Sequence, residues 1–148
     1  MVAQLDTKTV YTFMDSLISI KKYVETAKNL GYQTLGIMDI DNLYGVYHFM
    51  ETAIEQGIQP LLGVEMTLDY AGLPLNLRFL ALDSQGYRNL MKLSTLKMIG
   101  KSKWEEFQHL LEGIAVIVSV FEGIEALDLG REFYIGVFSD TPKQAFPH

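Results

Sequence analysis

The 148-residue sequence contains no cysteine, and this absence excludes several kinds of site at once. Disulfide frameworks, thiolate nucleophiles and zinc fingers all require cysteine. Histidine is scarce as well, since only His48, His109 and His148 are present. The longest apolar runs are too short to cross a bilayer, and the N-terminus lacks the basic and apolar regions of a signal peptide. We therefore expect a cytoplasmic protein that has no membrane partner.

Basic residues are too few for a chain that binds nucleic acid on its own. The sequence has 12 Lys and Arg residues against 18 Asp and Glu residues, which gives a net charge of −6. Affinity for DNA or RNA depends on neutralising backbone phosphates. One local basic stretch is interpreted as a solvated helix face, with a DNA contact as the less favoured alternative. Its members are Lys92, Lys97, Lys101 and Lys103.

The composition indicates a folded domain, because 49% of the residues are hydrophobic and 20% are charged. No linker or low-complexity tract divides the chain, so residues 1–148 are predicted to form one domain. The sequence stops soon after its last predicted strand, whereas a closed α/β barrel usually needs more than about 200 residues. We therefore expect an N-terminal fragment of a longer protein.

The first half alternates strands with helices, which is typical of parallel β-α-β units. Ser19 should cap the first helix and Gly31 should end it, while Asn42 and Gly57 should bound the second. The predicted elements are strands at 2–5, 34–38 and 59–68, with the first helix from residue 20. The predicted apolar face of the second helix is Leu43, Val46, Tyr47, Met50 and Ile54.

The second half begins with a change of pattern. Residues 70–74 are predicted to form a turn from which the strand at 75–82 returns antiparallel. The elements expected after it are helices near 86–99, 104–111 and 124–129 and strands at 114–120 and 133–138. The whole pattern predicts an α/β fold with a mostly parallel sheet or barrel.

Acidic residues lie at or near the ends of three predicted strands, where α/β folds commonly place their functional groups. Asp6 follows the first strand, Asp39 and Asp41 follow the second, and Glu65 lies within the third. Converging carboxylates would suit a divalent metal. From spacing alone we favour the simpler interpretation, in which these carboxylates cap helices or face solvent.

Four motifs occur in an order that resembles the PHP (polymerase and histidinol phosphatase) domain family. LDTKTVYTFMDS (5–16) resembles its opening motif, GIMDIDNLYG (36–45) its second and IQPLLGVEMTL (58–68) its third. GYRNLMKLST (86–95) resembles a segment typical of one branch, the alpha subunits of bacterial DNA polymerase III. The resemblance implies a PHP-type distorted (β/α) barrel, truncated here.

The sequence departs from the family where the family binds metals. The first two histidines of the family fall on Asp6 and Lys8, and the histidine of the second motif falls on Ile40, after a retained Asp39. Glu65 matches the family's metal-binding glutamate. Isoleucine offers no lone pair and an ammonium repels a metal ion. A buried carboxylate cluster needs a compensating cation, so Lys8 is predicted to pair with one of the three carboxylates.

We therefore predict a metal-free remnant site made of Asp6, Lys8, Asp39, Ile40 and Glu65, with no catalytic residue. The alternative is one Mg or Mn ion held by Asp6, Asp39 and Glu65. His48 and His109 are interpreted as structural or surface residues, and the terminal His148 is a poor candidate ligand.

The resemblance implies that the whole protein is a DNA-directed DNA polymerase with Mg in a downstream site, and that this segment is a structural scaffold without a cofactor. Its expected partners are the rest of the chain, DNA through the whole protein and a proofreading exonuclease. One alternative is a metal-dependent phosphoesterase, acting as a 3′-5′ exonuclease or pyrophosphatase. Another is an unrelated α/β enzyme. Exposed strands would also allow a dimer.

Overall fold

The computed structural model describes residues 3–4 and 19–137, which form a mixed sheet with helices packed against it. Its strands follow one another across the sheet in chain order. The β1–β2, β2–β3 and β5–β6 pairs are parallel, and the β3–β4 and β4–β5 pairs are antiparallel. The strands are β1 (Ala3–Gln4), β2 (Thr34–Ile40), β3 (Gln59–Tyr70), β4 (Leu73–Ala81), β5 (Ile114–Ser119) and β6 (Tyr134–Gly136).

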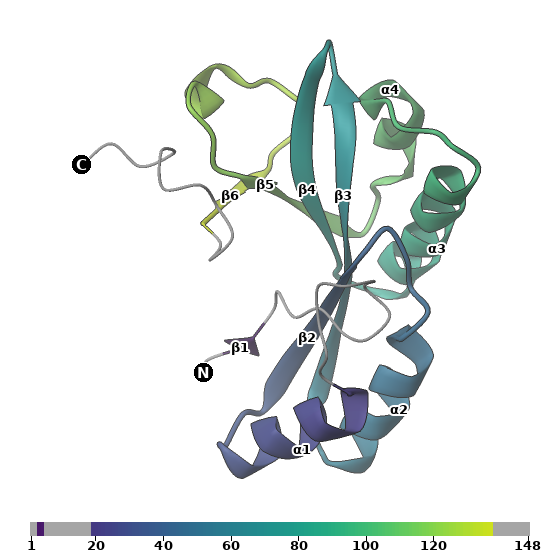
Figure 1. Cartoon of the computed structure of the whole chain (residues 1–148), viewed down its shortest axis with the longest axis vertical. Helices are drawn as coiled ribbons and strands as arrows, with labels where there is room; N and C mark the ends of the chain where they lie inside the picture. The colour runs from purple at the N-terminus through teal and green to yellow at the C-terminus, as the bar shows by residue number, and fades with distance from the viewer. Residues whose placement is uncertain (1–2, 5–18, 138–148) are drawn as a thin grey trace.

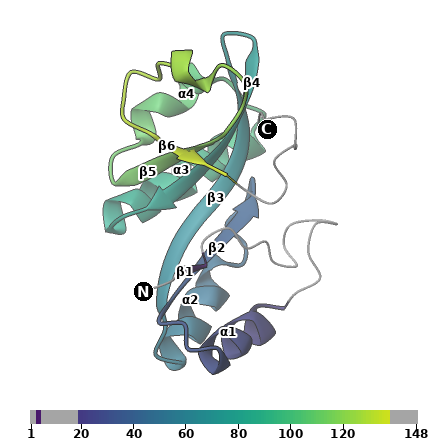
Figure 2. The same cartoon turned by 90° about the vertical axis from the view of Figure 1, so that its left-hand side faces the viewer.

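The helices gather near the two ends of the long strand β3, with α1 and α2 at one end and α3 and α4 towards the other (Figure 1). Figure 2 shows β1 beside β2 and β6 beside β5, and these two strands are the edges of the described sheet. The helices are α1 (Ile20–Asn29), α2 (Val46–Glu55), α3 (Ser84–Met98) and α4 (Trp104–Phe107), with 3-10 helices η1 (Gln108–Leu110) and η2 (Ile124–Ala126).

Two apolar clusters form the core. The smaller cluster joins α1 and α2 to β2 through Val24, Phe49 and Ile37. The larger one joins α3 and α4 to β3, β4 and β5, with Met66 and Phe107 among its buried members. These side chains are almost completely buried because each helix turns one apolar stripe towards the sheet.

Several predicted boundaries are confirmed. The Ser19 hydroxyl accepts a hydrogen bond from the Lys22 amide at 3.2 Å and caps α1. Gly31 and Gly57 follow α1 and α2 with φ of 87° and 73°, a conformation that glycine adopts without steric cost. The predicted turn before β4 is present, with Ala71 and Gly72 both at positive φ, as a tight hairpin turn requires.

The start of the second helix was predicted wrongly. α2 begins at Val46, and Asn42 instead closes a local turn by accepting a hydrogen bond from the Tyr44 amide at 3.1 Å. The buried stripe is therefore rotated from the predicted one. Tyr47 and Ile54 are 72% and 62% exposed, while Phe49 is fully buried.

Other differences concern strand direction and element length. The α/β class is confirmed, but the sheet is mixed, because β5 also pairs antiparallel with β4. β2 runs on through Asp39 to Ile40, and α3 starts at Ser84 with the Asp83 side chain as its cap. The predicted residues Val2, Leu5 and Phe138 lie outside the described residues. Within those residues, no helix has the length and apolar character needed to cross a membrane.

Candidate functional site: a buried ion pair on the sheet

The two faces of the sheet differ. Successive side chains of a strand point to opposite faces, and Leu35 and Ile37 pack under α1 and α2. Val64 belongs to the cluster under α3 and pairs in register with Asp39, so these residues share the helix-covered face. Met38 and Ile40 project from the other face, over which the described part of the chain places no helix.

A row of side chains crosses this second face. Ile40 is the register partner of Glu65, Glu65 of Arg78, and Arg78 of Ile117. Ile117 pairs in turn with Tyr134 on β6. Residues in register on neighbouring strands project from the same face. One carboxylate and one guanidinium thus lie between apolar neighbours in the middle of the row.

Glu65 and Arg78 form an ion pair. Nη2 of Arg78 lies 2.6 Å from Oε1 of Glu65. The Arg78 side chain is 1% exposed and the Glu65 side chain is 8% exposed. The other terminal nitrogen, Nη1, donates to Asn76 and to Ser119. The Ser119 hydroxyl donates to Oδ1 of Asn76 at 2.6 Å. Three strands therefore hold one buried cation and the groups that satisfy it.

Asp39 does not join this pair. It is 2% exposed, and its place in the alternation of β2 puts it on the helix-covered face, opposite Glu65. These two carboxylates therefore do not converge, and neither of them faces solvent, as the simpler interpretation of the sequence allowed. The reason is that β2 continues through Asp39 as regular strand, so the alternation of the buried residues before it decides its direction.

Asp41 marks the end of β2 with φ of 59°. Its amide donates to the Glu65 carbonyl at 2.8 Å, and its own carbonyl accepts from the Ser94 hydroxyl at 3.3 Å. Burial raises the pKa of the Asp41 carboxyl, and the positive charge of Lys97 opposes this shift. Lys97 itself donates to the Thr67 carbonyl at 3.1 Å. This junction ties the chain after β2 to both β3 and α3.

Asp6 and Lys8 lie outside the described residues, so the predicted pairing of Lys8 stays a prediction. His48 and His109 are exposed on α2 and η1, and His148 is also outside the described part. Across residues 19–137, no group of three or more histidine and carboxylate side chains is placed to hold a metal ion.

The described donors do not fit a divalent metal. Glu65 is the single carboxylate in the row, its neighbour Ile40 has no donor atom, and the next position holds the Arg78 cation. Sequence reasoning missed Arg78. The available signal was the alternation of β4, in which polar Asn76 and Arg78 interrupt the buried series Leu75, Leu77 and Phe79.

The comparisons with known sequences agree with one another. Residues 4–138 match the sequence model of the PHP domain family. The chain is 50% identical over 137 residues to DNA polymerase III subunit alpha of Streptococcus pyogenes serotype M1, covering 93% of this chain and 13% of that protein. DNA polymerase III subunit alpha of Rickettsia bellii is 30% identical over 128 residues, which cover 81% of this chain and 11% of that protein. The chain thus spans a small part of the length of these relatives.

Solved structures share the fold. A candidate metal-dependent phosphoesterase of Bifidobacterium adolescentis aligns with a TM-score of 0.60 at 13% identity, covering 93% of this chain and 71% of that one. An amidohydrolase of Chromobacterium violaceum, solved with sulfate and no metal, aligns with a TM-score of 0.58 at 12% identity. The alignment covers 79% of this chain and 66% of that one. At such low identity these similarities show a common fold and nothing about chemistry.

Proposed function

The chain belongs to the PHP domain family, and from this premise we propose that it is the N-terminal part of the PHP domain of a replicative DNA polymerase. The 50% identity to DNA polymerase III subunit alpha across 93% of the chain supports this proposal. In it, the mixed sheet is one portion of a PHP-type distorted (β/α) barrel, and the remainder belongs to the longer polypeptide.

The proposal assigns DNA synthesis to the whole protein. Nucleotide addition, with its Mg ions, would take place in domains outside this chain, which corresponds to 13% of its Streptococcus relative. The rest of the polymerase is then the main partner of this segment. The proposed partners also include DNA, bound by the whole protein, and a proofreading exonuclease that docks on the PHP domain.

Within the polymerase, this segment would act as a metal-free scaffold. The observation that carries this proposal is the buried ion pair of Glu65 and Arg78. Glu65 stands at the family's glutamate position, and a guanidinium already neutralises it from the neighbouring strand. A buried carboxylate needs a compensating charge, and here the protein supplies that charge itself.

The same geometry opposes metal binding. A divalent ion at Glu65 would be placed next to the Arg78 cation, and like charges repel strongly where water is scarce. Ile40, the register partner of Glu65, would add apolar atoms where the family has an imidazole. Releasing Arg78 to make room would separate a buried guanidinium from the Glu65 carboxylate, which is also unfavourable.

A metal-dependent phosphoesterase is the second candidate, because a protein described in that way has the same fold. In a polymerase such an activity would serve 3′-5′ proofreading or pyrophosphate hydrolysis. Arg78 and Ile40 weigh against this candidate for the reasons given above.

Metal content tests the two candidates directly. The chain is purified with Mn and Zn supplied, dialysed and analysed for bound metal, and assayed on bis(p-nitrophenyl) phosphate. Glu65→Ala is compared with Glu112→Ala, which removes an exposed carboxylate. We expect no stoichiometric metal and no turnover in any of the three proteins. A metal ion bound by the unaltered chain and by Glu112→Ala, but lost in Glu65→Ala, would overturn the scaffold and favour the phosphoesterase.

A further inference from the structure

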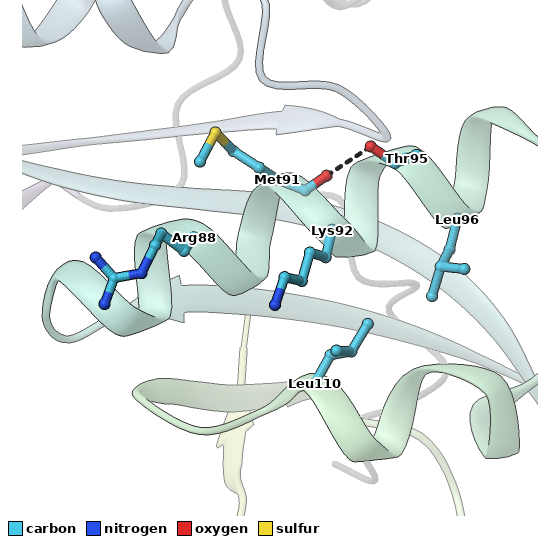
Figure 3. A pocket seen from close by; sticks show the side chains of 6 residues that line it. All are labelled: Arg88, Met91, Lys92, Thr95, Leu96 and Leu110. Carbon is cyan, nitrogen blue, oxygen red and sulfur yellow. Dashed lines mark hydrogen bonds between the residues drawn. The ribbon is translucent and has the colours of Figure 1, made fainter.

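A groove runs along the outer side of α3, on the helix layer and away from the Glu65–Arg78 pair. Its volume is about 520 Å³, and it lies between α3 and η1 (Figure 3). Lys92 and Leu96 of α3 and Leu110 of η1 point into the space between the two helices, and Arg88 borders one end. The residues that line it are Arg88, Met91, Lys92, Thr95, Leu96 and Leu110.

The floor of the groove is apolar. Leu96 and Leu110 are half-buried and pack against the larger core cluster. Thr95 turns its hydroxyl back to the Met91 carbonyl at 2.9 Å, so this hydroxyl is already satisfied within the helix. Met91 is 42% exposed at the margin. Methionine adapts its shape to different partners and is common at binding surfaces.

The apolar surface continues along α3 beyond the groove. Met98 and Ile99, at the end of the helix, are 63% and 65% exposed. The opposite side of α3, which includes Leu90 and Leu93, is buried against the sheet. The helix therefore has a second apolar stripe that the described part of the chain leaves uncovered. Exposed apolar patches of this kind mark interaction sites.

The margin of the groove is positively charged. Arg88 and Lys92 are both exposed, and neither forms an ion pair with a carboxylate among the described residues. Arg88 donates to the amide oxygen of Gln85 at 2.9 Å, which leaves its charge uncompensated. These two cations lie together on a chain whose net charge is −6. A segment that has apolar anchors and acidic flanks would complement this apolar floor and positive margin.

We infer that this groove binds an acidic amphipathic helix of a separate protein. From Arg88 to Leu96 the groove follows two turns of α3, about 12 Å at the helical rise. This length accepts the i, i+4 and i+7 apolar anchors of one helix. The groove lies on the helix layer, so its binding of such a helix does not depend on whether Glu65 binds a metal.

The lining argues against two other occupants. A nucleic-acid backbone needs a surface of donors and cations, whereas the floor here is made of Leu96 and Leu110. A second copy of this chain in a two-fold dimer would bring the same patch to face itself. Arg88 and Lys92 would then oppose their own copies, and like charges would repel.

Binding of a designed peptide tests the inference. The probe is a fluorescent helix of about four turns with leucine on one face and glutamate on the other. A matched peptide has lysine in place of glutamate. Fluorescence anisotropy measures both against the unaltered chain, the double variant Arg88→Glu/Lys92→Glu and the control Lys21→Glu/Lys28→Glu, which reverses two exposed charges on α1. Circular dichroism verifies that each variant is folded.

We expect the acidic peptide to bind the unaltered and control chains and to bind Arg88→Glu/Lys92→Glu at least about tenfold more weakly. The lysine peptide should show the opposite preference, and Met91→Glu should weaken both. Equal affinity for the groove and control variants would overturn the inference, as would absence of binding by the acidic peptide. Competition by a single-stranded oligonucleotide would show a nucleic-acid site instead, and concentration-dependent dimerisation abolished by Met91→Glu would show a self-interface.

Discussion

The Arg78 guanidinium lies 2.6 Å from the Glu65 carboxylate, and the two groups come from adjacent antiparallel strands. Removing one member of a buried ion pair takes a compensating charge away from the other member. We therefore expect Arg78→Met to lower the free energy of unfolding by about 3–5 kcal/mol. The measurement is urea denaturation followed by circular dichroism, with Arg88→Met as the control for an exposed arginine.

The double variant Arg78→Met/Glu65→Leu distinguishes a lost pair from lost packing. Replacing both charges by apolar groups of similar size also removes the buried carboxylate that Arg78 neutralises, so most of the lost stability should return. A double variant no more stable than Arg78→Met would show that the charge of Glu65 is not what makes the single substitution costly.

At Gly86 we predict a change in stability opposite to the one that helix propensity alone would give. This glycine lies in the first turn of α3, where an added Cβ would overlap the Gly113 carbonyl oxygen. Alanine usually stabilises a helix relative to glycine by about 1 kcal/mol. Here we expect Gly86→Ala to cost about 1–3 kcal/mol, because backbone must move. Thermal unfolding beside Ser84→Ala, an exposed position in the same turn, measures the effect; a stabilised Gly86→Ala would refute the close approach.

Asp41 should make stability depend on pH. Burial raises the pKa of its carboxyl in the folded state, so the folded chain binds this proton more tightly than the unfolded chain. The stability that this bound proton provides is therefore fully present below the pKa that the carboxyl has in the unfolded chain. It is lost as pH rises through the raised pKa of the folded chain. The substitution Asp41→Asn removes this titrating proton, and asparagine tolerates a φ of 59°.

We accordingly expect Asp41→Asn to gain stability relative to the unaltered chain as pH rises from about 4 to 7. Urea midpoints across this range provide the measurement. Glu51→Gln, on the exposed side of α2, controls for the loss of one negative charge. A stability difference that stays constant with pH would contradict the role assigned to burial.

Removing the Tyr23 hydroxyl should have a smaller effect on stability, and the same substitution at an exposed tyrosine provides the control. The Tyr23 hydroxyl donates to the Gly36 carbonyl at 2.6 Å and connects α1 to β2 inside the smaller core cluster. Tyr23→Phe keeps the ring and its stacking on Phe49. We expect a loss of about 0.5–1.5 kcal/mol in chemical denaturation. Tyr47→Phe, at a 72% exposed position, should change stability little; equal effects would contradict the assignment.

Much of the fold was predictable because local signals decide it. Ser19, Gly31 and Gly57 bound their helices through capping and positive φ, which depend on neighbouring residues alone. The hairpin between β3 and β4 follows for the same reason. The start of α2 was not predictable from such signals, because Asn42 can cap a helix or close a turn with the same side-chain oxygen.

The candidate site was harder to predict because it depends on which strands become neighbours. Glu65 and Ile40 were identified by resemblance, and the register brings them together. The partner of Glu65 was not identified, since Arg78 matches none of the recognised motifs and reaches Glu65 only through strand pairing. Asp39 could have been placed correctly, because its parity with Leu35 and Ile37 assigns it to the helix-covered face.

The chain-order arrangement of the strands also bears on how the protein is made. Each strand from β2 to β6 pairs with the one synthesised just before it, so no strand needs to wait for a distant partner. Pairing between strands that follow one another in the chain costs less loop-closure entropy than pairing between distant segments. During translation the sheet can therefore grow outward from β2 as the chain leaves the ribosome, with β6 docking last. Nascent chains halted after β4 should already contain a protease-resistant unit in which β3 pairs with both β2 and β4, with α1 and α2 packed against β2.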